Sequence, residues 1–147
     1  MCKIHGALVD LSIPILVVED MAILGRLIRD MLKQVGFQHV DLVIGSYTAL
    51  NRLRSSPYGV VISDWEMKPM SGLDLLKQIR LDEALTGTRF IMMTASASPE
   101  HAMAAKSAGA DDFIAKPFTA QVLKDKIIRV LALDGSLRSG AHAVAVY

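Results

Sequence analysis

The sequence predicts an α/β domain built on a doubly wound, mostly parallel sheet. Short apolar runs and amphipathic segments alternate five times between about residues 13 and 132. The runs are rich in β-branched residues and nearly free of polar positions, as expected for strands that are covered on both faces. Strands that alternate with helices in this way form parallel sheets with helices on both faces, joined by right-handed crossovers.

The five strand–helix units are bounded by residues that start or end helices. Gly36 follows the first helical segment where a left-handed residue is expected, and Pro57 ends the second. Ser98 and Thr119 precede the fourth and fifth helices as N-caps, with Pro99 at the first helical position. The predicted strands are 13–18, 38–44, 59–64, 89–95 and 111–116. The predicted helices are 24–35, 48–56, 73–82, 99–107 and 120–131, the last with an inner face of Val122, Leu123, Ile127, Val130 and Leu131.

Length and composition favour one globular domain. The chain has 147 residues, of which 52% are hydrophobic and 21% charged, enough for a substantial core. We place the domain at residues 13–132, after an N-terminal extension (1–12) that is expected to be partly disordered. The C-terminal tail (133–147) lacks an amphipathic pattern and is expected to be flexible.

Charge and cysteine usage exclude several classes of protein. The formal net charge of +1 argues against attraction to nucleic acid or to an anionic membrane. No apolar run reaches 18 residues, so no membrane insertion is expected. Cys2 is the only cysteine, which excludes an intrachain disulfide and allows a reducing compartment. Because the N-terminus also lacks a signal-peptide pattern, we expect a cytoplasmic protein.

Polar residues gather where the predicted strands end. Glu19 and Asp20 end the first strand, Asp64 the third, Thr94 stands near the end of the fourth, and Lys116 ends the fifth. Ligands of open α/β sheets bind beyond the carboxyl ends of the strands. The sequence therefore predicts that three carboxylates, a hydroxyl and an amine face one crevice.

This set of groups suits phosphoryl chemistry. Three neighbouring carboxylates repel one another, and a hard dication removes the conflict. Oxygen ligands without nearby His or Cys favour Mg²⁺, which keeps several waters and bridges to phosphate. A carboxylate that attacks a phosphoryl donor gives an aspartyl phosphate, and alignment with charge neutralisation provides most of the catalysis.

The chain resembles the receiver domain of bacterial two-component response regulators, most closely the single-domain chemotaxis type. The ordered set Glu19-Asp20, Asp64, Thr94 and Lys116 carries the resemblance, together with the segments VISDWEM, GLDLLKQIR and AGADDFIAKPFT. It covers about residues 13–132. It implies a flavodoxin-like (βα)5 fold with strand order 2-1-3-4-5, which is the known order of that family.

The resemblance also implies roles for these residues. Asp64 is expected to be the phosphoacceptor, and Lys116 to pair with the phosphoryl oxygens. The cofactor is expected to be Mg²⁺, held by Glu19, Asp20, Asp64 and the backbone carbonyl of Glu66. The protein is then a Mg²⁺-dependent phosphoryl acceptor with self-dephosphorylation, and not an enzyme in the usual sense.

For signalling, the resemblance implies a two-state switch. Thr94 is expected to move and hydrogen-bond the phosphoryl group, and Phe113 to be the switching aromatic residue. The Lys116–Pro117 bond is expected to be cis. A histidine kinase or a His-containing phosphotransfer protein would donate the phosphoryl group. A downstream protein would read the surface of the fourth helix, fifth strand and fifth helix.

The chain departs from the family beside the acceptor. The family has the pattern M-P-x-M where this chain has Met67-Lys68-Pro69-Met70, so the proline is displaced by one position. Glu66 is acidic two residues after the acceptor, and we hypothesise that it repels anionic donors or alters access of the hydrolytic water. Ser96 is small and is expected to leave its side of the site open. Trp65 is either a partner contact or a cover for the loop.

Structural and functional alternatives remain for these patterns. Glu19 and Asp20 also suit the start of a helix, and Phe113 an ordinary core. The main functional alternative is a phosphorylation-impaired receiver that acts only as a docking module. A phosphatase with an aspartyl nucleophile would have D-x-D, whereas this chain has Asp64-Trp65-Glu66. An FMN binder would need hydroxyl and glycine donors where this chain has VVEDMAIL.

Overall fold

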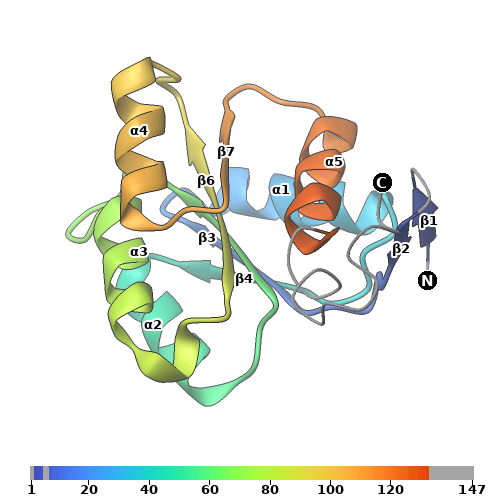
Figure 1. The fold of residues 1–147 in the computed structure, drawn as a ribbon, viewed down its shortest axis with the longest axis horizontal. Coiled ribbons are helices and arrows are strands. Elements are labelled where there is room, and N and C mark those ends of the chain that lie inside the picture. The colour runs from blue at the N-terminus through green and yellow to red at the C-terminus, as the bar shows by residue number, and fades with distance from the viewer. Residues whose placement is uncertain (1, 5–6, 133–147) are drawn as a thin grey trace.

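A computed structural model describes residues 2–4 and 7–132, and its main layer is a five-stranded parallel sheet (Figure 1). The sheet has the order β4-β3-β5-β6-β7, which confirms the predicted 2-1-3-4-5 arrangement of a doubly wound α/β domain. Its strands are β3 (Ile15–Glu19), β4 (Val40–Ile44), β5 (Val60–Asp64), β6 (Arg89–Thr94) and β7 (Asp112–Ala115). The helices are α1 (Ala22–Gln34), α2 (Ser46–Ser55), α3 (Gly72–Leu81), α4 (Pro99–Ala108) and α5 (Ala120–Leu131).

Two hydrophobic clusters hold the helices on the two faces of the sheet. Helices α1 and α5 pack on one face, and α2, α3 and α4 lie on the other (Figure 1). Successive residues of β3 enter opposite clusters: Ile15 and Val17 face α1 and α5, whereas Leu16 and Val18 face α2 and α3. A strand that is buried on both faces has no position for a polar side chain, which explains the continuous apolar runs of the sequence.

The predicted helix boundaries are confirmed by their caps. Ser98 Oγ accepts the backbone N–H of His101, and Thr119 Oγ1 accepts that of Val122, so each caps its helix. Gly36 follows α1 with φ +112°, a left-handed conformation that costs glycine little. The observed bounds of the five units differ from the predicted ones by two residues or fewer.

The structure also differs from the sequence prediction in places. No element was expected in the N-terminal extension, but β1 (Cys2–Ile4) and β2 (Ala7–Val9) pair as an antiparallel hairpin. A short 3₁₀ helix, η1 (Glu83–Leu85), precedes β6. The inner face predicted for α5 was wrong at Val122, which is 44% exposed. The buried residues of α5 are Leu123, Ile127, Ile128 and Val130.

Two further expectations concern the ends of the chain and membranes. The predicted flexible tail (133–147) lies outside the described residues. Within the described part of the chain, no helix combines the length and apolar character that a bilayer span requires.

Candidate functional site

The carboxyl edge of the sheet brings most of the predicted site residues together. Glu19, Asp64 and Thr94 are the last residues of the adjacent strands β3, β5 and β6, and Lys116 directly follows β7. Asp20 follows Glu19 and is exposed. Because all five strands are parallel, their ends meet at one edge, and residues far apart in sequence become neighbours there.

Lys116 links the two buried carboxylates of this edge. Its Nζ donates a hydrogen bond of 2.8 Å to Asp64 Oδ1 and lies 3.6 Å from Glu19 Oε2. The Asp64 side chain is 7% exposed and that of Lys116 is 20% exposed, so the pair is only partly screened by water. The ammonium group of Lys116 is therefore what makes a carboxylate tolerable at the end of a buried strand.

Glu19 is less well compensated than Asp64. Its Oε1 accepts the backbone N–H groups of Asp20 (3.0 Å) and Met21 (3.2 Å). Its Oε2 is buried and has no hydrogen-bond partner within the described part of the chain. Burial, followed by the negative charge of Asp64, raises the pKa of the Glu19 carboxyl above its ordinary value. Two buried carboxylates thus share one ammonium group, and the edge is short of positive charge.

The donor set fits a hard cation, although the side chains do not form a ready cage. Among the described residues, no group of three or more His, Cys, Asp and Glu side chains is close enough to hold a metal ion. Mg²⁺ uses only one or two protein carboxylates and keeps several waters, so it does not need such a cage. The buried, orphaned Glu19 Oε2 is the observation that favours a cation here.

The hydroxyl of Thr94 forms its hydrogen bonds with the backbone of Ser96, in the loop that follows β6. Thr94 Oγ1 donates to the carbonyl of Ser96 and accepts the N–H of Ser96, both at 3.0 Å. The backbone carbonyl of Thr94 accepts the N–H of Lys116 at 2.8 Å. The Thr94 side chain is fully buried. To donate to a group on Asp64, the hydroxyl would have to give up its hydrogen bond to the Ser96 carbonyl.

Two small residues without a predicted role, Gly72 and Ser46, shape the backbone around Asp64. Gly72 opens α3, and a Cβ there would collide with the carbonyl oxygen of Asp64. Its N–H donates to the carbonyl of Trp65 at 2.8 Å. Ser46 Oγ donates to the carbonyl of Met70 at 2.8 Å, so α2 holds the end of the acceptor loop. In the sequence, the adjacent Ser71 and Gly72 were the only sign that a helix begins here with a glycine at its first position.

The loop with the displaced proline is folded against the domain. Met67 is buried, whereas Glu66 and Lys68 are exposed. The Lys68–Pro69 bond is cis, and so is Lys116–Pro117, as the resemblance implied for the latter. Glu66 and Ser96 both lie in loops at the acceptor edge, where the sequence analysis placed their modulating roles. Those roles remain predictions.

Phe113 lies on the side of the site that faces α4 and α5. Its ring is half-buried against the α2–α3 cluster, and Lys126 Nζ lies 5.9 Å from the ring centroid. Lys126 also donates to Asp112 Oδ1 at 3.2 Å. Phe113 lines a cavity of about 490 Å³ with residues of α4, Asp112 and Arg129. This environment suits either a core aromatic or a switch, so both interpretations remain.

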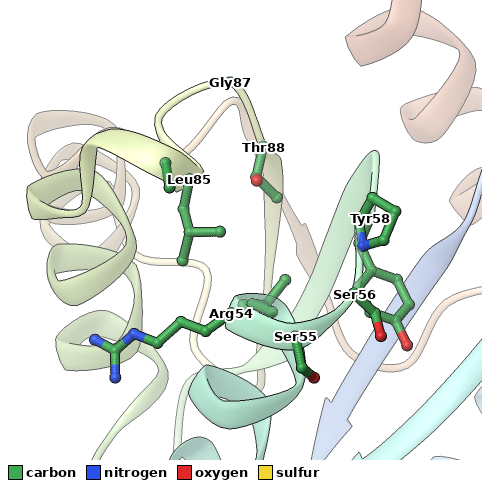
Figure 2. A pocket seen from close by; sticks show the side chains of 10 residues that line it. Arg54, Ser55, Ser56, Tyr58, Leu85, Gly87 and Thr88 are labelled. Carbon is green, nitrogen blue, oxygen red and sulfur yellow. The ribbon is translucent and has the colours of Figure 1, made fainter.

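A larger cavity of about 520 Å³ lies at the opposite, amino edge of the sheet (Figure 2). The end of α2, the start of β5 and η1 surround it, and Figure 2 shows the Arg54 guanidinium pointing away from the hydroxyls of Ser55, Ser56 and Tyr58. None of the predicted site residues lines it. The candidate site is therefore the carboxyl edge, which groups complementary charges, and not this cavity.

Comparison with known proteins gives one consistent result. The family model of the response regulator receiver domain matches residues 15–128. The chain is 36% identical to chemotaxis protein CheY-3 of Vibrio cholerae over 124 residues, which cover 84% of this chain and 95% of that protein. It is 38% identical to chemotaxis protein CheY of Pseudomonas aeruginosa over 116 residues, covering 79% and 94%.

Solved structures agree. The chemotaxis response regulator CheY4 of Vibrio cholerae superimposes with a TM-score of 0.75 and 27% identity, over 81% of this chain and 98% of that one. The BeF3-activated DrrB receiver domain superimposes with a TM-score of 0.71 and 27% identity, over 82% and 97%.

Proposed function

The chain belongs to the response regulator receiver domain family, and on that premise we propose that it is a receiver domain phosphorylated on Asp64. One observation carries the proposal. The Asp64 carboxylate is buried, bonded to Lys116 at 2.8 Å, and placed at a sheet edge that is short of positive charge. A purely structural ion pair would not need a second buried carboxylate beside it.

The chemistry follows from the contacts of Asp64. Lys116 engages Oδ1, so we assign the attack on phosphorus to Oδ2. The new oxygen–phosphorus bond forms as the bond from phosphorus to the donor nitrogen breaks, and the donor histidine keeps the electron pair and takes a proton. Lys116 then pairs with a phosphoryl oxygen. Alignment and charge neutralisation supply the rate, as in other phosphoryl transfers.

Mg²⁺ is the cofactor that this edge would hold. Glu19, Asp20 and Asp64 would offer carboxylate oxygens, directly or through the waters that Mg²⁺ keeps, and the backbone carbonyl of Glu66 would offer a further ligand from the loop after β5. When bound, the ion neutralises phosphoryl oxygens and relieves the repulsion between the carboxylates. We propose that a water then hydrolyses the aspartyl phosphate slowly, with Glu66 and Ser96 at the rim modulating its access.

The switch uses the groups that lie between Asp64 and the α4 face. A phosphoryl group on Asp64 offers acceptor oxygens to the Thr94 hydroxyl, which now donates to Ser96. We propose that movement of Thr94 and Phe113 changes the surface of α4, β7 and α5, and that a downstream protein reads this change. Phosphorylation would act by shifting the equilibrium between two conformations of the domain.

A protein donor has an apolar surface to dock on, next to Lys116. A groove of about 370 Å³ is lined by Leu24, Leu27, Ile28, Met31, Lys116, Pro117 and Phe118. Leu27 is 56% exposed and Ile23 77% exposed on the same helix. We propose that a histidine kinase or a His-containing phosphotransfer protein, acting in the cytoplasm, packs a helix here. Leu27→Asp should slow transfer from such a protein and leave transfer from acetyl phosphate unchanged.

The deciding experiment adds Mg²⁺ and acetyl phosphate to the full chain and follows phosphate by intact mass and Trp65 fluorescence. We expect one added phosphate and a fluorescence change, both Mg²⁺-dependent, and beryllofluoride should reproduce the change. Asp64→Asn should abolish all three, whereas Asp74→Asn, which alters an exposed carboxylate of α3, should not. A folded wild-type protein that gains no phosphate and ignores beryllofluoride would instead be a docking module.

A further inference from the structure

An aromatic contact that the proposed function does not use joins the acceptor loop to α4. The His101 ring lies edge-on to the Trp65 indole, with ring centroids 4.9 Å apart and planes at 62°. Trp65 directly follows Asp64, and His101 lies in the first turn of α4. Both side chains are half-buried. The residue next to the acceptor therefore touches the helix that begins beyond the Thr94 loop.

The other side of the imidazole is held by the cap of α4. His101 Nδ1 lies 2.8 Å from Ser98 Oγ, and Ser98 Oγ also accepts the backbone N–H of His101 at 3.2 Å. Ser98 Oγ can donate its hydrogen to Nδ1 or accept one from it, depending on the tautomer of the ring. The imidazole thus bridges the indole and the N-cap.

Hydrogen bonds hold the backbone on both sides of this bridge. The backbone N–H of Trp65 donates to the carbonyl of Met93 at 2.9 Å, and the backbone carbonyl of Trp65 accepts the N–H of Gly72 at 2.8 Å. The loop before α4 begins with the two Thr94–Ser96 hydrogen bonds and ends with the Ser98 cap. The direction of the Trp65 indole is then set by what it packs against.

We propose that His101 is a positioning residue for the acceptor site. Its imidazole holds the Trp65 indole next to Asp64 and ties that indole to the N-cap of α4. A change at Asp64 that moves Trp65 reaches the first turn of α4 by this route, separately from Thr94 and Phe113. The inference rests on the proposed function in so far as phosphorylation of Asp64 is the change that it transmits.

The first readout is Trp65 emission between pH 5 and 8 in the unmodified full chain, whose only tryptophan is Trp65. Histidine is the side chain that ordinarily titrates in this window, and an imidazolium quenches an indole that it touches. We expect a pH-dependent step that His101→Gln removes. His39→Gln is the matched control, because His39 is exposed before β4 and should leave the step unchanged. A step that survives His101→Gln overturns the inference.

Other charged groups do not imitate this step. Those on the elements around this end of α4 are Glu66 and Lys68 in the acceptor loop, Asp74 and Lys77 on α3, Glu100 and Lys106 on α4, and Asp112 on β7. Asp, Glu and Lys ordinarily titrate outside the window. Each of them, like the buried Glu19, is also retained in His101→Gln, so loss of the step identifies the imidazole.

The second readout separates the two halves of the bridge. His101→Phe keeps a ring against Trp65 and loses the Ser98 hydrogen bond, whereas His101→Asn keeps a polar partner for Ser98 and loses the ring. We expect the emission maximum of wild type in the Phe variant and a red shift in the Asn variant. Since an edge-on aromatic pair changes an equilibrium by roughly 2- to 10-fold, beryllofluoride affinity in the Asn variant should change by a similar factor.

Transmission is measured by amide hydrogen exchange of the first turn of α4, with and without beryllofluoride and Mg²⁺. We expect a response in wild type and a weaker one in both variants. Wild-type behaviour of both variants overturns the inference. A beryllofluoride response without a His101-dependent pH step also overturns it, and leaves the proposed function standing. A His101-dependent step without any beryllofluoride response overturns the proposed function and the transmission, while supporting the positioning of Trp65.

Discussion

The two edges of the same sheet differ in how their charged side chains are paired. At the carboxyl edge, Glu19 and Asp64 share the ammonium group of Lys116, and Glu19 Oε2 has no hydrogen-bond partner within the described residues. At the amino edge, the guanidinium of Arg80 lies 3.2 Å from Asp111 Oδ2 and donates to backbone carbonyls that include those of Thr88 (2.7 Å) and Gly109 (3.0 Å). Asp111 also accepts the N–H of Phe90 at 2.8 Å.

We interpret this difference as one of role. The charged groups of the amino edge stabilise the fold, whereas those of the carboxyl edge are available to a ligand. At the amino edge, the Arg80 guanidinium is bonded to backbone carbonyls, which are part of the fold. It therefore connects α3 to the loops before β6 and β7. At the carboxyl edge, the missing positive charge is what a cation and a phosphoryl group can exploit. The cavity of about 520 Å³ lies at the amino edge (Figure 2), and none of the candidate site residues lines it.

The largest expected effect comes from removing the acceptor. Asp64→Asn should abolish phosphorylation by acetyl phosphate to the limit of intact-mass detection, because the nucleophile is gone. The fold should survive, since Lys116 still has Glu19 at 3.6 Å and one buried negative charge has been removed. Thermal melting without Mg²⁺ checks the second half. A drop in Tm of more than about 8 °C, equivalent to roughly 2 kcal/mol or more, would show that Asp64 is needed for the fold.

Removing the shared cation should produce the largest loss of stability. Lys116→Met leaves Glu19 and Asp64 buried without compensation, and we expect a loss of about 2–3 kcal/mol at pH 7 without metal. Urea unfolding measures it. Lowering the pH lets Glu19 take up a proton, so the difference from wild type should shrink towards pH 4. A difference that is equal at pH 7 and pH 4 would mean that lost packing, not charge, is responsible.

Removing a carboxylate from the amino edge should lower stability and leave phosphorylation unchanged. Asp111→Asn weakens the contacts with Arg80 and Arg89 but touches nothing at the acceptor. We expect a loss of about 1–2 kcal/mol, since hydrogen bonds to charged groups are involved, with an unchanged rate of phosphorylation. Urea unfolding and intact mass on the same preparation check both. If phosphorylation slowed as well, the division between a structural and a functional edge would be wrong.

How far the sequence predicts this molecule depends on whether a feature is local. Strands buried on both faces, the caps Ser98 and Thr119, and polar residues at strand ends are all written in short segments, and the structure confirms their positions. The hairpin of β1 and β2 was missed because two three-residue strands carry too little periodicity to detect.

Contacts between distant segments could not be predicted. The strand ends predicted that Lys116 and Asp64 face one crevice, but not the hydrogen bond between them, and nothing in the sequence predicted the packing of His101 on Trp65. The hydrogen bonds that turn Thr94 towards Ser96 depend on a side-chain rotamer, for which the sequence has no signal. Such contacts follow from the crossovers that bring the strand ends together, and they appear only once the sheet is assembled.

The smallest effect tests the shortage of positive charge itself. The pKa of Glu19 is raised by burial and by Asp64, so the folded protein holds a proton at pH values where the unfolded chain has lost it. The stability that this proton provides is complete below the ordinary glutamate pKa and is lost as pH rises through the raised one. Metal-free Glu19→Gln should therefore be more stable than wild type at pH 7, by on the order of 1 kcal/mol, and no more stable at pH 4.

Mg²⁺ should reverse that order, because the ion stabilises the wild-type carboxylate and has lost a ligand in Glu19→Gln. Melting curves at pH 4 and 7, with and without Mg²⁺, give the four values needed, and Asp74→Asn is the exposed control. Equal stability of wild type and Glu19→Gln at pH 7 without metal would mean that Lys116 already neutralises both carboxylates. The carboxyl edge would then resemble the amino edge, and the orphaned Glu19 Oε2 would no longer indicate a cation.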